Sequence, residues 1–258
     1  MKKIWNSFIV AFAMYSKIPV PTADWSKENM KYALCFFPWI GAVIGLVEYG
    51  WFVLAETLQF DSVFRAAVMT LIPVLITGGI HLDGFLDTMD ALSSWKEKNQ
   101  RLAILKDPHA GAFAIISGCA YFTAYFGFAS QVSREVLPVF CLGFVISRSF
   151  SALSLMHFKN ANPKGSAAAF GTGAQKRAVT GVLVITAVAV YLGMILSNPA
   201  AGLCGIVFSL GVVGFYYFKS YKYFGGITGD LAGYFLCLCE LAVMVGTVIA
   251  RIGLEHIL

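Results

Sequence analysis

Seven long apolar segments constrain this chain more than any other feature. They lie at about 33–56, 64–80, 110–130, 136–156, 178–197, 200–218 and 230–250. A helix needs about 20 predominantly apolar residues to cross a bilayer, and of these segments the second is the shortest. Charged residues make up only 13% of the chain, whereas soluble domains contain about 25%. We therefore predict an all-α, polytopic integral membrane bundle of about seven spans, forming a single domain over residues 1–258.

The N-terminal segment has the pattern of a helix in the membrane interface. Ile4, Phe8 and Phe12 recur every four residues and therefore share one helical face. Two lysines followed by a short apolar stretch also imitate a signal peptide, but Asn6 and Ser7 interrupt the apolar core. We favour an N-terminal interfacial helix that precedes the spans.

The basic residues indicate how the spans are oriented. With the N-terminus in the cytoplasm, nearly all of them fall in cytoplasmic segments, as the positive-inside rule requires. The exceptions are Arg65, Arg134, Arg251 and, within the fourth span, Arg148. This topology places the loops 81–109 and 157–177 and the turn 219–229 in the cytoplasm. The basic residues are scattered at the ends of apolar segments, which fits the lipid bilayer as a partner and not nucleic acid.

One cytoplasmic segment is strongly acidic. The stretch GGIHLDGFLDTMDAL, residues 78–92, contains Asp83, Asp87 and Asp90. On a helix, Asp87 and Asp90 lie about 40° and 20° to either side of Asp83, so all three carboxylates share a face. Two such carboxylates about 5–6 Å apart repel by about 3 kcal/mol at an effective dielectric constant near 20. Hard oxygen ligands in this arrangement predict Mg²⁺ or Mn²⁺ between them; a solvated acidic loop is the alternative.

The rest of this loop contains further candidate ligands. Asp107 precedes a proline and cannot extend the same helix, so we expect it to close the site from another side. Arg101 and Lys106 fit a phosphate-bearing ligand beside the metal. His81 also flanks the acidic face, although a histidine with satisfied hydrogen bonds in a loop is the simpler interpretation.

A second motif lies on the same predicted membrane face. GGITGDLAG, residues 225–233, repeats the pattern G-G-I-x-x-D of the first stretch. Thr228 is a candidate N-cap of the last span, and Asp230 is either a helix-start acid or a further metal or ligand group. Arg148 and Glu240 lie inside spans, where charges pair or line a polar cavity. Pairing with each other and contact with substrate both remain open.

Taken together, these motifs resemble the cobalamin synthase family, whose members are also called adenosylcobinamide-GDP ribazoletransferases. The similarity rests on GGIHLDGFLDTMDAL, RLAILKDPHAGAFA and GGITGDLAGYFLCLCE, with SKIPVP and FFPWIGAVIG near the N-terminus. It extends from about residue 10 to residue 245.

The resemblance implies a multi-pass transferase in the cytoplasmic (inner) membrane of a prokaryote, with an active site that faces the cytoplasm and needs Mg²⁺. Adenosylcobinamide-GDP and α-ribazole, or its 5′-phosphate, would give adenosylcobalamin, or its 5′-phosphate, and GMP. Asp83, Asp87, Asp90 and Asp107 match the acidic motif and become the predicted metal ligands and catalytic residues, with Asp107 or Asp90 as the general base. The candidate substrate-binding residues are His81, Arg101, Lys106, Arg148, Lys164, Thr228, Asp230 and Glu240.

Two other function classes use similar residues. CDP-alcohol phosphotransferases and prenyltransferases also carry aspartate clusters on membrane helices, but the order of residues in DGFLDTMDAL fits neither motif. A cation transporter would place its acids near the middle of the bilayer, whereas these acids lie at a membrane end. Whether the protein forms a homo-oligomer is left open.

Overall fold

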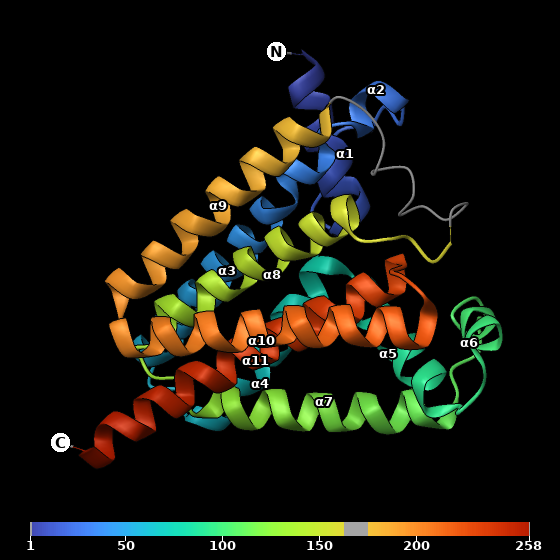
Figure 1. The fold of residues 1–258 in the computed structure, drawn as a ribbon. Helices are drawn as coiled ribbons and strands as arrows, with labels where there is room; N and C mark the ends of the chain where they lie inside the picture. Colours follow the sequence, from blue (N-terminus) through green and yellow to red (C-terminus); the bar gives the residue numbers. More distant parts are fainter. Residues whose placement is uncertain (1, 163–174, 258) are drawn as a thin grey trace.

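The computed structural model describes residues 2–162 and 175–257, and these ranges are predominantly helical (Figure 1). The elements are α1 (Lys2–Tyr15), α2 (Lys27–Met30), the 3₁₀ helix η1 (Ala33–Phe36), α3 (Phe37–Thr57), α4 (Ser62–Thr77), α5 (Ile80–Ser93), α6 (Lys98–Ile104), α7 (Ala112–Ser130), α8 (Leu137–His157), α9 (Gln175–Ser197), α10 (Pro199–Phe224) and α11 (Gly229–Ile257). The predicted all-α membrane bundle is confirmed.

Six helical segments in the described ranges are long and apolar enough to cross a membrane. They comprise the segment Glu28–Thr57, which ends in α3, and α7, α8, α9, α10 and α11. α4 reaches this criterion only together with α5, from which it is bent by 97°. Its 16 residues give a length of about 24 Å, less than the hydrocarbon core of about 30 Å. By length and composition, residues 2–162 and 175–257 therefore provide six candidate spans, or seven if the bent pair counts as one.

α8 forms the centre of the bundle. Of its apolar window 83% is buried, compared with 28% for α7, α9 and α10. α3 lies alongside α8 (Figure 1), and glycines allow the close approach. A Cβ atom on Gly45 would lie 2.6 Å from the carbonyl oxygen of Cys141, so a larger residue there would force the two helices apart. Small residues at such contacts are typical of membrane helices.

The N-terminal segment is a helix, as predicted, but its apolar face is divided. In the second half of α1, Ile9 and Phe12 are buried against the protein. In the first half, Ile4 and Trp5 remain 60% and 56% exposed. The helix is thus packed onto the bundle at one end and presents an apolar surface at the other, which suits a helix at the edge of a membrane.

Candidate functional site

The two acidic motifs begin with the same turn. Gly78 and Gly79 follow α4 with φ angles of 65° and 78°, and Gly225 and Gly226 follow α10 with φ angles of 75° and 153°. These backbone conformations favour glycine because it has no Cβ atom. Each glycine pair ends one helix and allows the next to start in a new direction. The repeated G-G-I-x-x-D pattern therefore places Asp83 and Asp230 in the first turns of α5 and α11.

Two further glycines bring α5 and α11 into direct contact. A Cβ atom on Gly84 of α5 would lie 2.7 Å from the carbonyl oxygen of Asp230. On α11, a Cβ atom on Gly233 would lie 2.7 Å from the carbonyl oxygen of His81. Only glycine fits at both places without moving the helices. The close contact brings the first turn of α11, with Asp230, against the acidic face of α5.

Replacing Gly84 with alanine should therefore disturb the site more than the fold. We expect the added methyl group to push Asp230 away from α5 and to lower any activity of the acidic cluster at least about tenfold, because displacements of about 1 Å at a reacting centre have effects of that order or larger. Gly50→Ala is the matched control, since Gly50 is an exposed helical glycine with no atom within 4 Å of an added Cβ. Equal turnover of both variants in lipid would show that the α5–α11 contact is not needed.

The three aspartates of α5 share one helical face, as predicted. Asp83 is exposed, while Asp87 and Asp90 are half-buried. Asp83, Asp90 and Asp230 all lie close enough to Asp87 to repel its charge. No ion pair within residues 2–162 and 175–257 includes any of these four aspartates. The site is thus a concentration of negative charge drawn from two helices.

The donor chemistry of this cluster fits a divalent cation. Carboxylate oxygens are the ligands that Mg²⁺ prefers, and a cation would relieve the repulsion around Asp87. In their present rotamers, no three Asp, Glu, His or Cys side chains of residues 2–162 and 175–257 converge closely enough to hold a metal ion. The assignment of a metal to Asp83, Asp87 and Asp90 stays a prediction.

Asp107 lies in the loop between α6 and α7, where its side chain interacts with a residue of its own turn. Its side chain is 54% exposed, and its Oδ1 accepts hydrogen bonds from the backbone N–H of His109 at 3.0 Å and pairs with Nδ1 of the same histidine at 2.8 Å. These interactions lower the pKa of Asp107. The carboxylate thus stabilises its own turn, and its predicted role as a fourth metal ligand or base stays untested.

The basic candidates of the same loop, Arg101 and Lys106, have different surroundings. Arg101 is buried and its guanidinium lies 4.6 Å from the centre of the Tyr223 ring, a cation–π contact between α6 and α10. Lys106 is exposed. Lys164 lies outside the described residues. Sequence reasoning missed Lys98, whose ammonium group lies against Gly225 at the turn before α11.

The segment after α8 supports the second motif. The backbone N–H of Ile227 donates to the carbonyl of Lys159 at 2.8 Å, and that of Ala161 donates to the carbonyl of Ile227 at 2.8 Å. Thr228 then caps α11, as predicted, by accepting a hydrogen bond from the N–H of Leu231 at 3.2 Å. These bonds fix the start of α11 and, with it, the position of Asp230.

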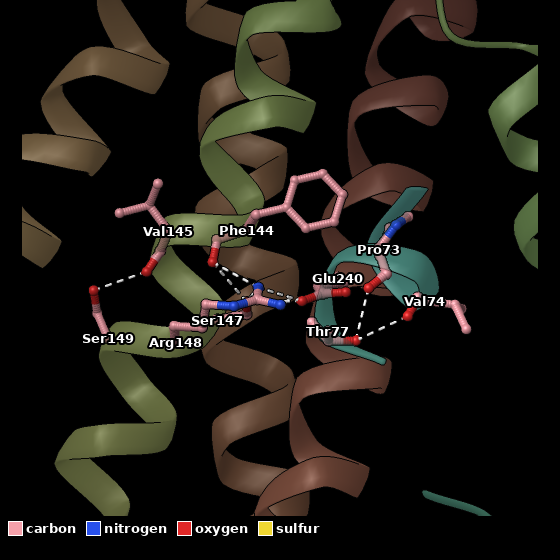
Figure 2. A network of polar contacts seen from close by, with 9 residues as sticks. All are labelled: Pro73, Val74, Thr77, Phe144, Val145, Ser147, Arg148, Ser149 and Glu240. Atoms are coloured by element: carbon pink, nitrogen blue, oxygen red, sulfur yellow. Dashed lines mark hydrogen bonds and ion pairs between the residues drawn. The ribbon is translucent and has the colours of Figure 1, made fainter. Parts of the chain in front are cut away.

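Arg148 and Glu240 form an ion pair in the centre of the bundle (Figure 2). Nη1 of Arg148 on α8 lies 2.5 Å from Oε1 of Glu240 on α11, and their side chains are 1% and 6% exposed. Ser147 donates a further hydrogen bond to Glu240 at 3.3 Å. Of the two interpretations that the sequence left open, pairing is confirmed, and contact with substrate is untested.

His81 is not the loop histidine that we expected. It lies in the first turn of α5 and is buried, with its ring next to those of Tyr15 and Phe37. Its Nε2 has no hydrogen-bond partner among the described residues. Its place near Asp83 keeps it a candidate for contact with a ligand.

Glu48 is a polar residue of the core that sequence reasoning missed. It lies in the middle of α3 and is fully buried, and neither carboxyl oxygen has a hydrogen-bond partner in the described part of the chain. It is close enough to Glu240 for the two charges to interact. The signal was present, because Glu48 interrupts an apolar segment just as Arg148 does, and such residues are functional candidates by default.

These features define a class of protein. It is a polytopic helical membrane protein with an acidic site at one end of its bundle, built from two helices that contact each other through glycines. The chain belongs to the cobalamin-5-phosphate synthase family, which it matches over residues 7–248. The match covers both acidic motifs and the central ion pair. It confirms the family that the sequence motifs indicated.

Several named relatives match nearly the whole chain. A protein of Lachnoclostridium phytofermentans is 47% identical over 95% of this chain and 94% of its own length. Proteins of Clostridium botulinum and Geobacillus sp. are 31% and 28% identical, over 93% and 92% of this chain and 96% and 92% of their own lengths. All three are named adenosylcobinamide-GDP ribazoletransferase. No solved structure matches the chain.

Proposed function

We propose that this protein is an adenosylcobinamide-GDP ribazoletransferase, which joins adenosylcobinamide-GDP and α-ribazole, or its 5′-phosphate, to give adenosylcobalamin, or its 5′-phosphate, and GMP. The observation that carries the proposal is the contact between Gly84 and Asp230, because it unites the two acidic motifs in one site. Relatives that bear this name match 95% and 93% of the chain.

The reaction is a transfer of a phosphoryl-bearing group. An oxygen of the acceptor's ribose hydroxyl attacks the phosphorus that is bonded to the cobinamide side, and a new P–O bond forms. The bond from that phosphorus to the bridging oxygen of the diphosphate breaks, and GMP leaves with the electron pair. A carboxylate of the cluster accepts the hydroxyl proton. Phosphoryl transfer of this kind depends on positioning and charge stabilisation.

Asp83, Asp87 and Asp90 would hold Mg²⁺ in this proposal, with Asp230 beside them. Bound there, the cation would neutralise charge on the diphosphate oxygens and on the departing GMP. The acids themselves keep the site negative, and the close α5–α11 contact holds them at a fixed separation. Lys98 lies against the turn before α11, and Lys106 follows α6; both would supply positive charge for an anionic substrate.

The site would face the cytoplasm, in the inner membrane of a prokaryote. Most of the basic residues outside the spans lie on the side of the bundle that carries α5, α6 and the start of α11. Arg65, Arg134 and Arg251 lie towards the opposite side. The positive-inside rule therefore supports this orientation, which also gives nucleotide substrates access from the cytosol.

Removal of divalent cations should abolish turnover. We expect purified protein in lipid, given adenosylcobinamide-GDP, α-ribazole and Mg²⁺, to release GMP and form cobalamin. A chelator should lower the rate at least about 100-fold, since the cation supplies several kcal/mol of charge stabilisation, and added Mg²⁺ or Mn²⁺ should restore it. Absence of product from folded protein would refute the proposed function. Full turnover in excess chelator would refute the metal alone.

A further inference from the structure

A cavity of about 290 Å³ opens beside the acidic site. Its wall is formed by α1, α3, α5, α8 and α11, so that five segments far apart in sequence meet around it. Asp83 and Asp230 both line it. Asp83 is exposed and Asp230 half-buried. A ligand in the cavity would therefore lie directly next to the carboxylates at which the reaction is proposed to occur.

Three rings form an aromatic wall on one side of the cavity. The ring centroids of Tyr15 and Phe37 are 4.4 Å apart, and the ring of His81 lies 6.2 Å from Tyr15 and 5.6 Å from Phe37. Most of the remaining lining is apolar. A flat aromatic ligand gains stacking and edge contacts on such a surface.

The wall also contains polar groups without partners. Nε2 of His81 and Oγ of Ser151 are buried, and neither has a hydrogen-bond partner among the described residues. A buried polar atom without a partner is costly. A ligand with a ring nitrogen or a hydroxyl group at this depth would relieve that cost.

The size and chemistry of the cavity distinguish between the parts of the two substrates. Ligand pockets usually measure about 300–1,000 Å³, so this one suits a single small ring system and is too small for a corrin macrocycle. Guanine carries donors and acceptors around most of its edge, which a mainly apolar wall cannot satisfy. The base of α-ribazole is a fused aromatic ring system that is mostly apolar.

We propose that this cavity binds the aromatic base of the acceptor nucleoside, with its sugar directed towards Asp83 and Asp230. The assignment rests on the proposed function and deepens it, because it separates the acceptor site from the donor site. Tyr15 and Phe37 contact the base, and His81 and Ser151 provide its polar contacts. The donor then approaches the carboxylates from outside the cavity, along the exposed side of Asp83.

The test compares two buried rings on the same helix. Phe37→Leu removes a ring from the cavity wall, whereas Phe52→Leu removes an equally buried ring of α3 elsewhere, because Phe37 and Phe52 are 1% and 0% exposed. We expect Phe37→Leu to raise the KM for α-ribazole about tenfold and to leave the KM for adenosylcobinamide-GDP within about twofold. Phe52→Leu should change neither constant.

A second variant keeps the proposal testable if Phe37→Leu does not fold. Ser151→Ala removes only the unpartnered hydroxyl and should raise the KM for α-ribazole about three- to tenfold. Calorimetric titration of α-ribazole alone into the protein in lipid nanodiscs should show the same weakening for each variant. This binding measurement does not depend on turnover.

The outcomes separate the two proposals. A raised KM for adenosylcobinamide-GDP, or equal effects on both substrates, would overturn the assignment of the cavity, and so would the absence of α-ribazole binding to the wild-type protein. If wild-type protein binds α-ribazole, and the wall variants weaken that binding, but no cobalamin forms, the proposed function is refuted. The assignment of the cavity to the aromatic base of the nucleoside then still holds.

Discussion

Replacing Asp83 with asparagine should lower turnover at least about 100-fold while the protein remains folded. Asparagine has the same shape as aspartate but lacks the negative charge that the site needs to hold a cation and a diphosphate. Losing a single preorganised group of this kind costs about 10²–10³ in kcat. Because Asp83 is exposed and lies among other acids, removing its charge should leave thermal stability unchanged or slightly raised. Steady-state release of GMP at several Mg²⁺ concentrations measures the effect.

Asp61→Asn is the matched control for this substitution. Asp61 caps α4, at the end of that helix remote from the site, by accepting a hydrogen bond from the N–H of Phe64 at 2.8 Å. Asparagine caps helices about as well as aspartate, so turnover should stay near that of the wild type. Near-normal activity of Asp83→Asn, or an equal loss in both variants, would remove Asp83 from the proposed metal site.

Breaking the central ion pair should have the largest effect on stability. Glu240→Leu leaves the guanidinium of Arg148 without its buried carboxylate partner, and loss of one partner of a buried pair typically costs about 3–5 kcal/mol. We expect a marked drop in the unfolding temperature in detergent. Replacing both residues, as Arg148→Met with Glu240→Leu, should recover most of the loss, because apolar pairs of similar volume are often neutral or stabilising.

The double variant also distinguishes the two roles of the pair. If Arg148 and Glu240 are structural, the double variant should regain both its unfolding temperature and its turnover. If they also contact substrate, stability should return without activity. A double variant as unstable as Glu240→Leu would show that the ion pair is not what makes Glu240 necessary.

Local sequence patterns were sufficient to predict the helical elements and one face of the site. The apolar segments are long enough to cross a bilayer, and the i, i+4, i+7 spacing of Asp83, Asp87 and Asp90 places them on one face of a helix. The structure adds that the second segment is short and continues into α5 after a bend of 97°. The bend depends on the left-handed backbone at Gly78 and Gly79. The glycine pair in the sequence did not indicate the direction in which α5 would continue.

Tertiary contacts were beyond what one sequence can show. The contact between the backbones of Gly84 and Asp230 could not be predicted from the sequence. The two residues are far apart in the chain, and the packing of α5 against α11 brings them together. The bond between Asp107 and His109 could not be predicted from the sequence, and the role of Asp107 as a metal ligand stays a prediction. Glu48 could have been found, since a lone acid within an apolar span is visible without a structure.

The two residues of the central ion pair are synthesised at different times, which affects how the bundle assembles. Arg148 enters the membrane with α8, whereas its partner Glu240 belongs to α11, which is translated later. An unpaired charge is costly in lipid. Until α11 is inserted, the guanidinium of Arg148 therefore needs a polar environment other than Glu240, either in the translocon or against earlier helices. Asp230 also belongs to α11, so the core ion pair and the acidic cluster are both completed when this helix is inserted.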